Sequence, residues 1–162
     1  MMTAKKPTRI EKDVAGKKLV VVREFDAPLH QVWKAWTESD LLDQWWAPKP
    51  YKTETKTMDF YEGGRWLYAM VGPDSSRSWC LADFKTIIPE KSFTMKEGFC
   101  DEKGNITPDF PLMSWVVSFA QVDHCTAVTV EITFDKEEDL NKIVEMGFEQ
   151  GFTAAHGNLD EL

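Results

Sequence analysis

One histidine stands where an imidazole could take part in chemistry. His156 follows Phe152 by four residues, which is about one helical turn, so both side chains are expected on one helix face. The pKa of an imidazole lies near neutrality, so His156 beside an apolar pocket could orient a ligand or accept a proton. The alternative is a histidine at the core boundary with a satisfied hydrogen bond. The sequence is compatible with both roles for His156.

A single arginine is expected to point into the protein. Arg23 is two residues from both Val21 and Phe25 in an apolar segment, so the three side chains are expected on the same face of a strand. A buried unpaired charge costs several kcal/mol, so we expect Asp59 to be buried with Arg23 as a structural ion pair. The alternative role for Arg23 is recognition of an anionic ligand group in a pocket.

Other reactive-looking motifs have simpler explanations. Gly63-Gly64 lacks the frame of a phosphate-binding loop and is typical of a tight turn. Asp123-His124-Cys125 are adjacent in a turn, where their side chains point apart. The three cysteines form no C-x-x-C pair, and no two of the three histidines lie within a helical turn. We therefore predict a non-catalytic protein with no metal and no cofactor.

Aromatic and methionine side chains are the more informative set. They alternate along strands or repeat along the last helix, and they are predicted to line an apolar ligand pocket together with Arg23 and His156. The aromatic and methionine members are Trp46, Trp66, Tyr68, Met70, Phe93, Met95, Trp115, Phe119, Phe148 and Phe152. The alternative is that they fill the core. Paired glycines, Gly147 and Gly151, and flexible methionines favour a pocket.

The elements that position these residues follow from the hydrophobic periods. A β-branched run predicts a strand over 19–25, and helical spacing predicts short helices over 29–36 and 40–45. From 52 to 134, apolar and polar residues alternate and turn sequences are frequent, which predicts antiparallel strands. Apolar residues at spacings of three and four then predict one helix of roughly 25 residues at the C-terminal end. The order indicates an α+β helix-grip fold, a curved antiparallel sheet wrapped around a long C-terminal helix, with an elongated cavity between them.

Length and charge limit the remaining possibilities. The 162 residues suit a single domain, which we place at 18–162 after a polar N-terminal extension over 1–17. The formal net charge of −8 opposes binding to nucleic acid or to an anionic membrane surface. No apolar run suggests a signal peptide or a membrane span, and we expect a cytoplasmic protein, a monomer or a dimer.

Six motifs occur in one order and match a known family. They are Phe25-Asp26-Ala27-Pro28, the segments 32–37 and 59–66, Trp45-Trp46-Ala47-Pro48, Ile88-Pro89-Glu90-Lys91 and the segment 147–152. Over about 18–162 the chain resembles homologues of the activator of the ninety-kilodalton heat-shock chaperone ATPase. That family lies in the START and birch-pollen-allergen-like superfamily (SRPBCC), which includes polyketide cyclases, dehydrases and lipid transport proteins.

The resemblance implies a helix-grip fold, a connection to the stress response and three candidate functions. The first is binding of a small apolar or amphipathic molecule between the sheet and the last helix. The second is a co-chaperone-like module whose partner is a chaperone with ATPase activity. The third is a cyclase- or hydrolase-type enzyme that uses His156 with a carboxylate. The segment 100–111 resembles an insertion and is expected to reshape the mouth of the pocket.

Overall fold

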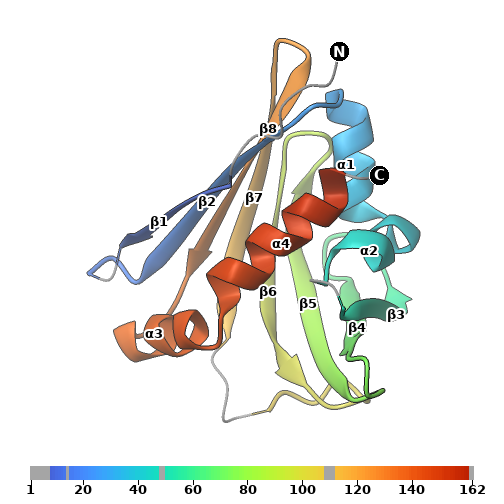
Figure 1. Ribbon diagram of the computed structural model, residues 1–162, viewed down its shortest axis with the longest axis vertical. Coiled ribbons are helices and arrows are strands. Elements are labelled where there is room, and N and C mark those ends of the chain that lie inside the picture. Colours follow the sequence, from blue (N-terminus) through green and yellow to red (C-terminus); the bar gives the residue numbers. More distant parts are fainter. Residues whose placement is uncertain (1–7, 14, 48–49, 108–111, 161–162) are drawn as a thin grey trace.

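The computed structural model describes residues 8–13, 15–47, 50–107 and 112–160, and these form one curved sheet with four helices (Figure 1). The sheet is eight-stranded and antiparallel, in the order β1-β2-β8-β7-β6-β5-β4-β3. The elements are β1 (Arg9–Asp13), β2 (Lys18–Phe25), α1 (Leu29–Thr37), α2 (Ser39–Trp45), β3 (Lys52–Met58), β4 (Arg65–Val71), β5 (Arg77–Ile88), β6 (Ser92–Cys100), β7 (Met113–Val122), β8 (Cys125–Thr133), α3 (Glu137–Glu145) and α4 (Phe148–Asp160).

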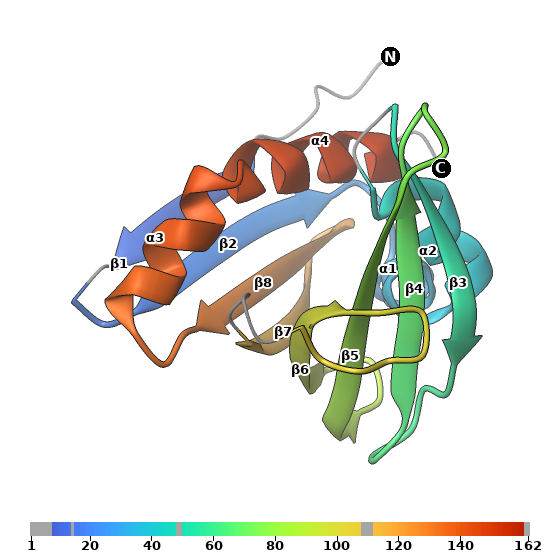
Figure 2. The same ribbon diagram turned by 90° about the horizontal axis from the view of Figure 1, so that it is seen from below.

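The sheet bends around the last helix. Figure 2 shows α4 lying across the concave side of the sheet, while α1 and α2 close one end of the space between them. An antiparallel sheet with one apolar face needs such a cover, and the amphipathic C-terminal segment supplies it. The predicted α+β helix-grip fold is confirmed.

Strict alternation of burial explains why the strands adopt this register. Every second residue of β2, from Leu19 to Phe25, is buried, and the same holds in β8 from Thr126 to Ile132. A shift of one residue would turn each of these side chains to solvent, so the apolar pattern fixes the pairing.

The N-terminal segment contributes more than the sequence predicted. Arg9–Asp13 form β1, which pairs with Lys18–Val22 at the edge of the sheet. Its side chains are mostly exposed, so hydrophobic alternation gave no signal for this strand. Residues 1–7 of the expected extension lie outside the described residues.

The prediction of one long C-terminal helix is wrong. The chain forms two helices, α3 and α4, which meet at an angle in Figure 1. Gly147 lies between them with φ of +87°, and its N–H donates to the Val144 carbonyl at 3.0 Å. This left-handed conformation ends a helix and strongly favours glycine. The glycine that interrupts the helical period therefore marks a turn.

Two glycines in this region are expected to respond oppositely to the same substitution. Gly147→Ala should lower the free energy of unfolding by about 1–2 kcal/mol, because a Cβ is strained at positive φ. Gly157→Ala, inside α4 where an added Cβ would meet nothing within 4 Å, should raise it by about 0.5–1 kcal/mol. Urea unfolding measures both. Equal effects of the two substitutions would contradict the assigned turn.

Candidate functional site

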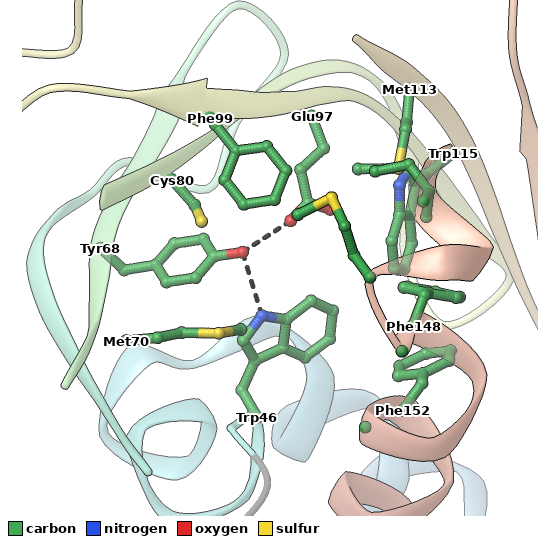
Figure 3. A pocket seen from close by; sticks show the side chains of 14 residues that line it. Trp46, Tyr68, Met70, Cys80, Glu97, Phe99, Met113, Trp115, Phe148 and Phe152 are labelled. Carbon is green, nitrogen blue, oxygen red and sulfur yellow. Dashed lines mark hydrogen bonds between the residues drawn. The ribbon is translucent and has the colours of Figure 1, made fainter. Parts of the chain in front are cut away.

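A pocket of about 220 Å³ lies between the sheet and the two C-terminal helices (Figure 3). Strands β4 to β7 supply one wall, α3 and α4 supply the other, and Trp46, directly after α2, closes the inner end. The lining residues are Trp46, Tyr68, Met70, Cys80, Glu97, Phe99, Met113, Trp115, Ile143, Met146, Gly147, Phe148, Gly151 and Phe152.

The lining contains half of the predicted ligand-binding residues. Those present are Trp46, Tyr68, Met70, Trp115, Phe148 and Phe152, and Gly147 and Gly151 lie among them. Those outside the lining are Arg23, Trp66, Phe93, Met95, Phe119 and His156, all of them buried. Trp66 contacts the pocket wall, because its ring stacks on that of Tyr68 with 4.0 Å between centroids. Phe93 and Phe119 instead pack around Trp33 at another part of the core.

His156 is a core residue. Its side chain is almost fully buried, its ring centroid lies 4.2 Å from that of Phe152, and its Nδ1 shares a 3.1 Å hydrogen bond with Thr8 Oγ1. Burial, with a smaller contribution from the positive charge of Arg23, lowers the pKa of His156 to about 3. The ring is therefore neutral at physiological pH and does not line the pocket, so the geometry gives no support to His156 as a general base there.

Arg23 is buried as predicted, but the expected ion pair with Asp59 is wrong. Arg23 lies in β2 with 3% of its surface exposed, whereas Asp59 is exposed after β3, at the opposite edge of the sheet. The Arg23 guanidinium lies 4.8 Å from the Phe25 ring centroid and donates through Nη1 to the His156 carbonyl at 3.5 Å. A cation–π contact and a carbonyl acceptor are thus among the interactions of this charge.

A hydrogen-bonded chain of three side chains crosses the inner end of the pocket (Figure 3). Trp46 Nε1 donates to the Tyr68 hydroxyl at 3.1 Å, and that hydroxyl donates to Glu97 Oε1 at 2.6 Å. All three side chains are buried, and Glu97 is 6% exposed. Among the described residues, Glu97 Oε2 has no hydrogen-bond partner.

The burial of Glu97 changes the titration of its neighbourhood. Desolvation raises the pKa of Glu97 to about 7, and the hydrogen bond from Tyr68 opposes this rise. The pKa values of Tyr68 and Cys80 are also raised, mainly by burial and secondly by the negative charge of Glu97. The pocket therefore contains one carboxyl group that can change its charge near neutral pH, together with a neutral phenol and a neutral thiol.

Glu97 was missed by reasoning from the sequence, although a signal was present. In β6, Phe93, Met95, Glu97 and Phe99 occupy alternate positions, so the glutamate shares the face of three apolar residues. An acidic residue on an otherwise apolar inward face is the pattern that indicates a functional group.

The described part of the insertion-like segment flanks the pocket without lining it. The lining reaches Phe99 in β6 and resumes at Met113 in β7, and residues 100–107 contribute no side chain to it. Residues 108–111 lie outside the described part of the chain.

The fold and pocket define the class of this protein, a helix-grip protein built on a START-type ligand-binding scaffold. The chain belongs to the family described as "Activator of Hsp90 ATPase homolog 1-like protein", whose model matches residues 26–162. In the described residues, no helix has the length and apolar character needed to cross a membrane.

Two solved bacterial structures show the same architecture. Protein Ms6760 from Mycobacterium smegmatis is 27% identical, with a TM-score of 0.89 and coverage of 96% of both chains. A protein from Arthrobacter aurescens, solved in solution, is 31% identical, with a TM-score of 0.89 and coverage of 94% of this chain and 88% of that one. No curated protein matches the chain significantly.

Proposed function

We propose that this protein binds a small, mainly apolar ligand in the pocket between the sheet and α3–α4. The observation that carries the proposal is the pocket itself, a space of about 220 Å³ whose walls are aromatic rings and thioethers. An engineered apolar cavity of about 150 Å³ is sufficient to bind benzene. A pocket of this size therefore suits a ligand with a single ring or with two fused rings.

The pocket walls suit an aromatic ligand. Trp46, Trp115 and Phe152 have ring centroids 5.7–5.9 Å apart, and Phe148 lies 5.3 Å from Phe152. An aromatic ligand that enters this cluster can make edge-to-face or offset contacts with these rings, which stabilise a bound ring beyond the area that it buries. Burial of apolar surface contributes about 25 cal/mol per Å² before the costs of association.

Gly151→Phe is expected to weaken this binding strongly. Gly151 lines the pocket from α4, so a ring at this position would occupy the ligand's space. With 2-methylnaphthalene as the probe, an NMR chemical-shift titration should give a dissociation constant at least about tenfold higher for the variant. Gly157→Phe is the matched control, because this residue of α4 does not line the pocket and a Cβ added there meets nothing within 4 Å. Unchanged affinity in Gly151→Phe would refute the proposed site.

The family description supplies a second candidate, stimulation of a chaperone ATPase. It predicts that saturating amounts of this protein raise ATP turnover by a bacterial chaperone of the ninety-kilodalton class. Ligand binding comes before it, because the apolar pocket and its hydrogen-bonded side chains are features of this chain that support binding directly.

A further inference from the structure

We propose that the ligand carries an ammonium group on a compact apolar body, and that this group donates a hydrogen bond to Glu97 Oε2. This inference rests on the proposed function and specifies the class of molecule that the pocket would take. Three observations support it: a buried carboxylate oxygen has no hydrogen-bond partner, the hydrogen bonds around it have a defined direction, and the described pocket lining has no positively charged side chain.

The position of Glu97 is the first step. Its side chain lines the pocket and is 94% buried, and Oε2 has no hydrogen-bond partner among the described residues. A buried polar atom without a partner destabilises the protein, and more so where the group is charged. A ligand that supplies a donor at this oxygen would remove that cost, so the site favours donor-bearing ligands over plain hydrocarbons.

The direction of the hydrogen-bonded chain then defines which oxygen is open to a ligand. An indole N–H can only donate, so the Tyr68 oxygen accepts from Trp46 and its one hydrogen goes to Glu97 Oε1. Oε1 is therefore held as an acceptor by the protein. Oε2 is the atom that binds a proton when Glu97 is neutral, and it is the acceptor for the ligand when Glu97 is charged.

The charges of the lining residues indicate whether the pocket favours a cationic or an anionic ligand. Among the described residues, the lining contains no lysine, arginine or histidine, so a carboxylate ligand would find no counter-charge there and would meet Glu97. The Trp115 Nε1–H is a further buried atom with no partner in the described residues, but it offers one neutral hydrogen bond and no charge. An ammonium group would pair with Glu97 within a lining that also contains the indole rings of Trp46 and Trp115, to which a cation is attracted.

The titratable groups of the pocket support the assignment of an ammonium ligand. In the part of the chain that the structure describes, the titratable lining residues are Glu97 from β6, Tyr68 from β4 and Cys80 from β5, whereas β7, α3 and α4 supply none. The pKa of Glu97 is about 7, so binding of an ammonium ion would require, and would stabilise, the charged form. The affinity for a cation should therefore fall by up to about tenfold per pH unit below this pKa.

The test compares probes that share one ring system. Dissociation constants are measured by NMR titration for 2-methylnaphthalene, 2-(aminomethyl)naphthalene and 2-naphthoic acid. The amine should bind at least about tenfold more tightly than the hydrocarbon, and the acid more weakly than both. Glu97→Gln should remove the preference for the amine while it retains binding of the hydrocarbon. Glu145→Gln removes an exposed charge of α3 and should leave the preference unchanged.

The outcomes separate the two proposals. If the hydrocarbon binds and the amine binds no better, or if Glu97→Gln keeps the preference, the ammonium assignment is overturned and the pocket proposal stands. If none of the three probes binds, the proposed function itself fails. Should Glu97→Gln not fold, the wild-type protein decides, because the preference for the amine must then decline between about pH 8 and pH 5.

Discussion

His156→Phe is expected to protect the protein against acid. Relative to this variant, the wild-type protein should lose about 4 kcal/mol of unfolding free energy between about pH 7.5 and pH 3.5. The cause is the burial of the imidazole, which packs against Phe152, together with a smaller contribution from the positive charge of Arg23; these lower the pKa of His156 to about 3.

The sign follows from the two states of the histidine. In the unfolded chain His156 binds a proton near its ordinary pKa of 6.5, whereas in the folded protein it does so only near 3. Its contribution to stability is therefore fully present above about pH 6.5 and is lost as the pH falls toward 3. Below pH 6.5 protons accumulate on the unfolded state and favour unfolding.

Urea unfolding at a series of pH values measures this effect as the difference between wild type and variant. Leu140→Ala is the control, since it removes packing from a buried position of α3 without removing a titrating group. Its loss of stability, about 2–5 kcal/mol, should be the same at each pH. A difference between wild type and His156→Phe that does not change with pH would show that the ring is hydrated in the folded state.

The sequence allowed the main elements to be predicted where burial is periodic. The run 19–25 corresponds to β2, and the run 126–134 to β8, because each has one buried and one half-buried face. The strand β1 was missed, since an exposed edge strand leaves no apolar period. The turn at Gly147 was missed because apolar spacing records the buried face and not the sign of φ.

The site was predictable in part for a similar reason. Alternation places Tyr68, Phe93 and Trp115 on the concave face, but it does not say where along that face a space remains. Phe93 therefore packs around Trp33, while Tyr68 and Trp115 line the pocket. The contact between Tyr68 in β4 and Glu97 in β6 reaches across β5, and it depends on the strand order and curvature.

Glu97→Gln is expected to reveal a second dependence on pH, opposite in sign to that of His156. Between about pH 4 and pH 8 the wild-type protein should lose about 3 kcal/mol of unfolding free energy relative to the variant. The reason is the raised pKa of Glu97, about 7 in the folded protein against an ordinary value of 4.5. Its contribution is fully present below about pH 4.5, and it is lost as the pH rises through 7.

Met113→Leu is the control for this measurement. Met113 lies opposite Glu97 in the register of β6 and β7 and also lines the pocket, so the substitution alters the same wall without changing its charge. Its unfolding free energy should follow that of wild type at each pH with a constant offset. Equal pH profiles for Glu97→Gln and wild type would mean that Glu97 titrates as if exposed, and the buried acceptor on which ammonium recognition depends would then be absent.

Addition of 2-(aminomethyl)naphthalene should recover part of the stability lost at high pH, because the bound ammonium group compensates the buried charge.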